Sequence, residues 1–113
     1  REMVMPMQLI IGLGMGDTVA LVTDSRFSGM NKGAFIGHVS PEAMEGGPIA
    51  VVDNGDLIEI DIPNRKLNIK LSDEELKRRL QEWRPLEPKV KKGVLGLYAK
   101  VAESLSKGGG FRI

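Results

Sequence analysis

The residues best suited to chemistry lie in one short segment, residues 23–29, directly after an apolar run. This segment holds a carboxylate at Asp24, a guanidinium at Arg26 and a hydroxyl at Ser28. In open α/β proteins, residues just beyond the C-terminal ends of strands often face a ligand crevice. Asp24 can orient a neighbouring group there, Arg26 can pair with a carboxylate, and Ser28 can act as a base or a nucleophile. The segment is therefore a candidate catalytic site.

The alternative for the same segment is a tight turn, in which serine and aspartate side chains bond to the local backbone. A lone serine is a poor base, because its hydroxyl ionises far above neutral pH unless another group assists it. From these residues alone, the turn is the favoured interpretation. The single histidine, His38, leaves a similar choice between acid–base chemistry and a structural hydrogen bond, and the structural role is favoured.

Three glycine-rich stretches lie in this part of the chain, at 12–16, 25–29 and 33–38, and the second of them contains Arg26 and Ser28. Glycine lets backbone N–H groups approach an anion closely, so a phosphate or carboxylate cradle is one interpretation. Neither the Gly-x-x-x-x-Gly-Lys-Ser/Thr loop nor the spacing of a dinucleotide fingerprint is present. Tight turns between strands are thus favoured over an anion site.

The composition of the chain limits this chemistry further. Its 113 residues suit one domain, and its 42% apolar residues can form a core. It has no cysteine and one histidine, which excludes disulfides and any iron–sulfur or multi-histidine metal site built from this chain alone. No apolar run approaches the roughly 20 residues that span a membrane. We expect a cytoplasmic protein without membrane contact.

Charge is divided unevenly along the chain. The net charge is only +1, which argues against a dedicated nucleic-acid binder. Residues 1–64 nevertheless carry nine acids and three bases, whereas residues 65–113 carry six acids and 13 bases. A basic patch for an acidic partner is one explanation, but such runs usually form a solvated helix face, and that explanation is favoured.

The elements that would position these residues divide at about residue 71, with strands and glycine loops before it and helices after it. The apolar run at 18–23 predicts a buried strand, and the apolar run at 49–52 predicts another. Together with the alternating patterns at 57–62 and 67–71, the run at 49–52 predicts a three-stranded meander over 49–71. Between them, Ser40 and the proline after it predict the start of a short helix, which glycines and a proline at 46–48 end.

Helices in the second half are predicted by their ends. Ser72 and Glu75 form a capping box, which begins a helix that continues to about Trp83. Apolar residues at helical spacing over 94–105 predict a last helix, ended by the glycines at 108–110.

Longer stretches of the sequence share one resemblance, in order and over nearly the whole chain. The first reads Leu-Val-Thr-Asp-Ser-Arg-Phe-Ser-Gly, and together the stretches cover residues 21–29, 37–43, 45–50, 56–64, 72–76, 97–100 and 106–108. They closely resemble the C-terminal part of dihydroxy-acid dehydratases.

The resemblance implies an α/β fold of the swivelling β/β/α type found in aconitase-like enzymes, β-rich in its first part and helical in its C-terminal part. Residues 1–113 would form a single domain of this type, truncated at its N-terminus, without the large N-terminal cluster-binding domain. Residues 1–16 would then lack the strands that they pair with and would expose backbone groups or methionines.

The family implies a hydro-lyase that removes water from a 2,3-dihydroxy acid to give a 2-oxo acid, in valine, leucine and isoleucine synthesis. It also implies an iron–sulfur cluster and Mg²⁺, neither held by this chain alone, so the isolated chain would be inactive. The expected partners are the missing N-terminal domain, the small-molecule substrate and a second copy of the parent enzyme.

Two family residues carry over to this sequence. Ser28 matches the serine of the family's Arg-Phe-Ser-Gly motif, the proposed base that takes the C2 proton. Glu2, in Arg-Glu-Met, matches a glutamate that reaches the Mg²⁺ site from this domain. Ser25 stands where the family usually has glycine, which puts the geometry of this tight turn in question.

Two other functions stay open. One is a sugar-acid or phosphogluconate dehydratase of the same superfamily, although Phe27 and residues 37–42 favour the branched-chain enzyme. The other is a stand-alone β/α module that binds a partner or an anion through its glycine loops.

Overall fold

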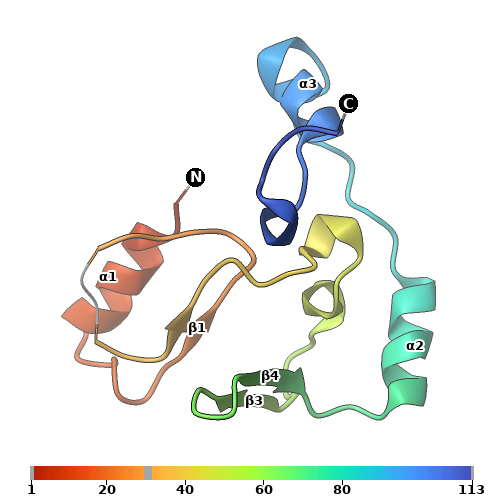
Figure 1. The fold of residues 1–113 in the computed structure, drawn as a ribbon. Coiled ribbons are helices and arrows are strands. Elements are labelled where there is room, and N and C mark those ends of the chain that lie inside the picture. The colour runs from red at the N-terminus through yellow and green to blue at the C-terminus, as the bar shows by residue number, and fades with distance from the viewer. Residues whose placement is uncertain (1, 30–31, 113) are drawn as a thin grey trace. The chain divides into compact units, whose positions relative to one another are not determined.

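The computed structural model describes residues 2–29 and 32–112, and these ranges contain three α-helices and two small sheets (Figure 1). The chain divides into two compact units. Unit 1 is formed by Arg1–Ser40 together with Ala102–Ile113, and unit 2 is formed by Pro41–Val101. The mixture of helices and sheets confirms the predicted α/β class.

Unit 1 begins with helix α1, Val4–Gly12, which the sequence analysis did not predict. Pro6 fits into its first turn because backbone N–H groups there have no helical partner. Met7 is only 1% exposed, whereas Met5 is 73% exposed. The expectation of exposed backbone groups was therefore wrong for Val4–Gly12, because these residues form a helix. The expected exposure of a methionine is confirmed at Met5.

The small sheet of unit 1 has two parallel strands, β1 (Leu21–Val22) and β2 (Phe35–Ile36). The strand predicted at 18–23 is correctly placed but too long, because β2 pairs with only two of its residues. The backbones stay paired beyond the strands, where the N–H of Val39 donates to the carbonyl of Thr23 at 3.1 Å.

The C-terminal part of unit 1 is a closed loop. Ala102 and Phe111 form an antiparallel bridge, and between them lies the 3₁₀ helix η3, Leu105–Lys107. The helix predicted to continue to the glycines at 108–110 was therefore wrong at its C-terminal end: the antiparallel pairing begins at residue 102. The hydroxyls of Ser40 and Ser104 share a hydrogen bond of 3.0 Å within this unit.

Unit 2 begins with two 3₁₀ helices, η1 (Ala43–Glu45) and η2 (Pro48–Val51). The short helix expected to be capped by Ser40 is thus a single 3₁₀ turn that follows Glu42. The strand predicted at 49–52 was wrong. Pro48 lies in the first turn of η2, has a fixed φ and no N–H, and therefore suits a helix start better than a central strand position.

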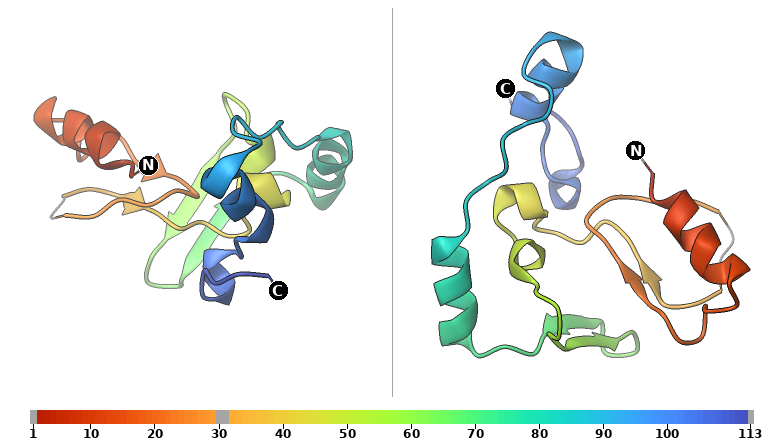
Figure 2. Two further views of the ribbon diagram at one scale, coloured as in Figure 1. Left: turned by 90° about the horizontal axis from the view of Figure 1, so that it is seen from above. Right: turned by 180° about the vertical axis from the view of Figure 1, so that it is seen from behind.

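An antiparallel hairpin follows, with strands β3 (Ile58–Asp61) and β4 (Lys66–Ile69) side by side in both views of Figure 2. The predicted meander therefore has two strands rather than three. The carboxylate of Asp61 accepts hydrogen bonds from the backbone N–H and the side-chain amide of Asn64, at 3.1 and 2.8 Å, and these bonds stabilise the turn.

Helices α2 (Asp73–Glu82) and α3 (Gly93–Val101) complete unit 2. The capping box is confirmed at its serine, because Ser72 Oγ accepts a hydrogen bond from the N–H of Glu75 at 3.2 Å and Trp83 is the C-cap. Among the described residues, no helix has both the length and the apolar character needed to cross a membrane.

The hydrophobic core is smaller than the composition predicts. Met7 is the only fully buried hydrophobic residue in the ranges that the structure describes. Helix α3 shows the same lack of cover, with Val94 82% and Leu97 62% exposed. Much of the apolar surface is thus left uncovered by this chain.

Gly47 carries a stability prediction. A Cβ atom at this position would overlap the backbone carbonyl oxygen of Pro41, which cannot move without shifting η1 or η2. We expect Gly47→Ala to destabilise the chain by about 1–3 kcal/mol, the usual cost of overpacking. Gly12→Ala is the matched control, since its Cβ would meet no atom within 4 Å. Urea unfolding of both variants measures the difference, and equal midpoints would contradict the prediction.

Candidate functional site

The segment after β1 is held in place by backbone pairing and by one buried side chain. Thr23, 8% exposed, accepts a hydrogen bond from the N–H of Ser25 on its hydroxyl at 3.0 Å. The carbonyl of Ser25 in turn accepts the N–H of His38 at 2.8 Å. A local side-chain turn is therefore present, and the Thr23 hydroxyl provides it. Ser25 does not have a positive φ, so a serine fits at this position without backbone strain.

The side chains of the next three residues, Arg26, Phe27 and Ser28, point alternately to opposite sides of the segment. Phe27 packs edge-to-face against Phe35 of β2, with ring centroids 6.4 Å apart, and Gly37 leaves room beside its ring. In an extended backbone, neighbouring side chains point to opposite sides. Arg26 and Ser28 therefore share the side of the segment opposite Phe27.

Glu2 lies on that same side, although it is 26 positions away from Ser28 in the sequence. A parallel bridge pairs Glu2 with Arg26, and the N–H of Met3 donates to the carbonyl of Arg26 at 2.6 Å. This backbone contact brings the side chains together: Ser28 Oγ donates to Glu2 Oε2 at 3.4 Å, and Arg26 Nε lies 4.0 Å from Glu2 Oε1. The structure thus brings together the two residues that the resemblance selected.

This Glu2–Arg26–Ser28 cluster combines three chemical abilities. The carboxylate can accept the hydroxyl proton of Ser28, and its oxygens are of the type that bind hard cations such as Mg²⁺. The guanidinium of Arg26 offsets the negative charge of the carboxylate. Ser28 is exposed and the side chain of Glu2 is 43% exposed, so both are accessible from solvent.

The described residues contain no group of three or more His, Asp or Glu side chains that could hold a metal ion. Glu2 can supply one oxygen ligand of the type that hard cations prefer. The chain has no cysteine, so it offers no thiolate to an iron–sulfur cluster.

The glycine-rich stretches are used for close packing. A Cβ at Gly16 would lie 2.7 Å from the carbonyl oxygen of Lys32, and one at Gly33 would lie 2.6 Å from the carbonyl oxygen of Gly16. Gly33 also has a φ of +139°, which side chains rarely adopt. These contacts favour turns and close backbone approach over an anion cradle.

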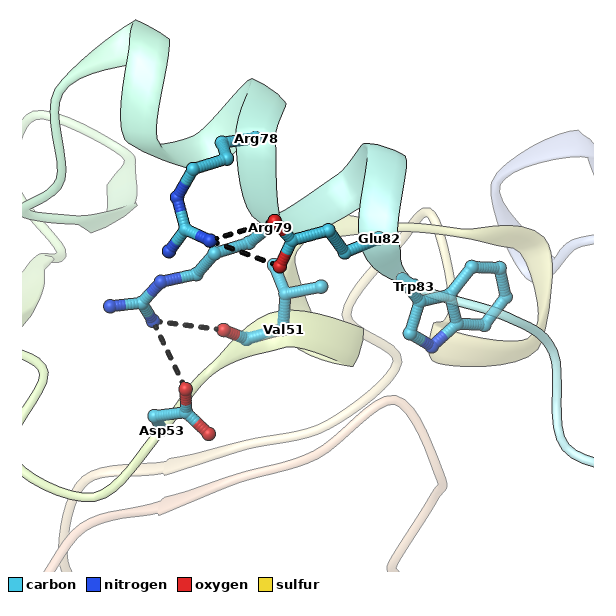
Figure 3. A pocket seen from close by; sticks show the side chains of 6 residues that line it. All are labelled: Val51, Asp53, Arg78, Arg79, Glu82 and Trp83. Atoms are coloured by element: carbon cyan, nitrogen blue, oxygen red, sulfur yellow. Dashed lines mark hydrogen bonds and ion pairs between the residues drawn. The ribbon is translucent and has the colours of Figure 1, made fainter.

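A separate pocket lies in unit 2, with a volume of about 310 Å³ (Figure 3). Its lining residues come from η2, the turn that follows it, and α2: Val51, Asp53, Arg78, Arg79, Glu82 and Trp83. Trp83 also packs near Gly46, where a Cβ would lie 3.4 Å from the indole ring.

Both arginines of this pocket are already paired with acids. Arg79 donates to Asp56 at 2.6 Å, to the carbonyl of Val51 at 3.1 Å and to Glu75 at 2.8 Å. Arg78 donates to Glu75 at 2.8 Å and to Glu82 at 2.9 Å. The pairs connect α2 to η2 and to the turn before β3, so this pocket is a structural charge cluster. Both arginines face acids of this chain, and the side chain of Arg79 is only 18% exposed.

The cluster makes an acid-stability prediction. Hydrogen bonds from Arg78 and then Arg79 lower the pKa of Glu75 from 4.5 to about 2. A carboxyl with a lowered folded-state pKa stabilises the fold fully above its unfolded pKa, and this contribution is lost as pH falls. We expect the urea concentration at the unfolding midpoint to decrease as the pH is lowered from about 4.5 to about 2.

Glu75→Gln should flatten this pH dependence and lower the midpoint at pH 7. Glu74→Gln is the control, because Glu74 lies in the same helical turn and has no ion pair among the described residues. Equal pH profiles for the two variants would contradict the assignment.

Sequence reasoning missed the contact between Arg79 and Asp56. The Glu75–Arg79 spacing of four residues does predict their helical ion pair. Asp56, however, lies in a turn 23 positions earlier, and no local pattern connects it to α2.

Comparison with known proteins identifies the family. A family described as dihydroxy-acid/6-phosphogluconate dehydratase C-terminal matches residues 1–109. The dihydroxy-acid dehydratase of Caldanaerobacter subterraneus is 57% identical over 112 residues, which are 99% of this chain and 20% of that protein. Those of Clostridium botulinum and Methanococcus aeolicus are 58% and 52% identical over 108 residues, 96% of this chain and 20% of each protein.

The chain therefore spans about a fifth of the length of the curated relatives that it matches. The match covers the Glu2–Arg26–Ser28 cluster as well as both units of the fold. This protein belongs to the dihydroxy-acid/6-phosphogluconate dehydratase family, and it corresponds to the C-terminal part of that family's proteins.

Proposed function

We propose that this chain is the C-terminal, swivelling domain of a dihydroxy-acid dehydratase, a hydro-lyase that converts 2,3-dihydroxy acids to 2-oxo acids in branched-chain amino-acid synthesis. The relatives named dihydroxy-acid dehydratase support the substrate class. The observation that carries the proposal is the 3.4 Å contact between Ser28 and Glu2, which joins two residues 26 positions apart at one accessible site.

Dehydration of such an acid removes the proton from C2 and the hydroxyl group from C3, which together leave as water. The enol that forms gains a proton at C3 and loses one from its C2 hydroxyl, which gives the 2-oxo acid. In our proposal Ser28 takes the C2 proton, for which its hydroxyl must first lose its own. Glu2 lies within reach of that hydroxyl proton, and a neighbouring base is what a weak serine nucleophile or base requires. Arg26 keeps positive charge beside the carboxylate.

The chain's residues fit the two cofactors of this family unequally. Glu2 fits Mg²⁺ as one hard oxygen ligand, whereas nothing in the chain fits an iron–sulfur cluster, because cysteine is absent. When bound, Mg²⁺ supplies positive charge that favours an ionised oxygen next to it. We propose that an N-terminal domain of the full-length enzyme holds the cluster and the other metal ligands.

The same proposal covers the whole enzyme. Residues 1–113 belong to one domain, the parent enzyme is a homodimer in the cytoplasm, and its partner in catalysis is its own N-terminal domain. Neither nucleic acid nor a membrane takes part.

The test is turnover by the full-length enzyme. We expect anaerobically prepared enzyme with Mg²⁺ to convert a branched 2,3-dihydroxy acid to its 2-oxo acid, and to act poorly on 6-phosphogluconate. A preference for 6-phosphogluconate would establish the other activity named in the family description. Failure with both substrates would reject the proposed function.

The isolated chain of 113 residues should behave differently. After anaerobic reconstitution we expect no stoichiometric iron or sulfide and no turnover, because it offers no cysteine to a cluster. Iron and sulfide analysis of the purified chain measures this, and one cluster per chain would contradict the expectation.

A further inference from the structure

Arg26 has an unusual position relative to the proposed catalytic pair. Its backbone pairs with Glu2, and its carbonyl accepts the N–H of Met3 at 2.6 Å. Its side chain lies on the same side of the extended segment as Ser28, two residues later. The main chain therefore holds Arg26 beside Glu2, and its side chain lies near the carboxylate.

The carboxylate of Glu2 is contacted from two directions. Ser28 Oγ donates to Oε2 at 3.4 Å, while Arg26 Nε lies 4.0 Å from Oε1. Each carboxylate oxygen thus has its own neighbour.

Glu2 needs such a neighbour because little else restrains it. Its side chain is 43% exposed, and a glutamate at the surface has several rotamers of similar energy. A single long hydrogen bond to Ser28 selects among them weakly. A second contact of opposite charge favours the rotamers in which Oε2 faces Ser28.

We propose that Arg26 is a positioning residue, which holds the carboxylate of Glu2 in the orientation that meets the hydroxyl of Ser28. The proposal rests on the proposed function, in which Glu2 and Ser28 act together. In this proposal Arg26 acts on the reaction through Glu2.

The alternative is that Arg26 merely stabilises the loop. An exposed ion pair contributes little to stability, and the side chain of Arg26 is 67% exposed. The backbone bridge, which any residue other than proline can form, does the structural work at this position. The two roles therefore predict different results when the side chain alone is changed.

The test is a double-mutant cycle in the full-length enzyme, with Arg26→Met, Glu2→Gln and the double variant. We expect Arg26→Met to lower kcat by about tenfold with little change in KM, because small misplacements of a catalytic group are costly. In the Glu2→Gln background the same substitution should cost less than about twofold, since its effect passes through Glu2. Arg26→Lys, which keeps the charge, should recover part of kcat.

The matched control is Arg84→Met, which removes an arginine that, within residues 2–29 and 32–112, donates to the backbone carbonyls of Gln81 and Trp83. Its kcat should equal that of the wild type. Crystal structures of full-length wild type and Arg26→Met add a readout that is independent of activity. We expect the variant to keep the backbone contact between residues 3 and 26 while the Glu2 carboxylate turns away from Ser28.

Additive losses in the cycle, or an unchanged Glu2–Ser28 contact in the Arg26→Met crystal structure, would overturn the proposal. Wild-type enzyme without activity on a 2,3-dihydroxy acid would instead overturn the proposed function. In that case the crystal structures alone still decide whether Arg26 orients Glu2, so the two failures are distinguishable.

Discussion

Replacing Ser28 with alanine in the full-length enzyme should lower kcat by about 10²–10⁴-fold, the usual contribution of a general base. Alanine removes the hydroxyl that meets Glu2 and leaves the backbone of the segment intact, because Phe27 still packs against Phe35. KM should change little, since a base acts mainly in the transition state. Steady-state kinetics with a 2,3-dihydroxy acid, beside measured iron and magnesium content, provide the test.

Ser25→Ala is the natural comparison for this variant. Ser25 lies in the same segment, and the bond that it gives to Thr23 comes from its backbone N–H, which alanine also has. Its kcat should stay close to that of the wild type. If the Ser28 hydroxyl only stabilised a turn by a hydrogen bond, its removal would cost about 1 kcal/mol of stability and leave activity nearly intact. A Ser28→Ala enzyme with more than about a tenth of wild-type kcat would support the turn.

The second large effect concerns Glu2. Glu2→Gln keeps the size of the side chain but removes its charge, so it can neither take the Ser28 proton nor bind Mg²⁺ as an anionic oxygen. We expect kcat to fall by about 10–100-fold or more, with a higher Mg²⁺ concentration needed for half-maximal rate. The measurement is the Mg²⁺ dependence of turnover by the full-length enzyme.

Asp17→Asn serves as the control for charge, since Asp17 is another exposed acid of unit 1. Its Mg²⁺ dependence should match that of the wild type. A Glu2→Gln enzyme that shows the wild-type kcat and Mg²⁺ dependence would remove Glu2 from the site.

The sequence predicts best those elements that are defined by their own ends. Ser72 and Trp83 mark the limits of α2 because a cap bonds to residues three or four positions away. The run at 49–52 was misassigned because a short apolar run has no clear period. The factors that decide it, Pro48 and the contact of Gly47 with Pro41, involve backbone geometry beyond hydrophobic pattern.

The sequence likewise predicts some parts of the site and not others. Local sequence indicates the turn of residues 23–25, and the resemblance selects Ser28 and Glu2. Residue spacing alone does not place Glu2 beside Arg26, since their bridge joins segments that lie on either side of a helix and a strand. The alternation that sets Phe27 against Phe35 also becomes visible only once β2 is in place.

The chain leaves unit 1 at Ser40 and returns to it at Ala102, and the hydroxyls of Ser40 and Ser104 are only 3.0 Å apart. Unit 2 is therefore inserted into the sequence of unit 1, and the two chain segments that connect the units leave unit 1 at neighbouring positions. During synthesis, unit 2 is complete as soon as residue 101 has emerged, whereas residues 2–40 can meet Ser104 only after that. Unit 1 must consequently close after unit 2 has been made, and a short flexible linker from residue 40 to residue 102 should be able to replace the whole insertion.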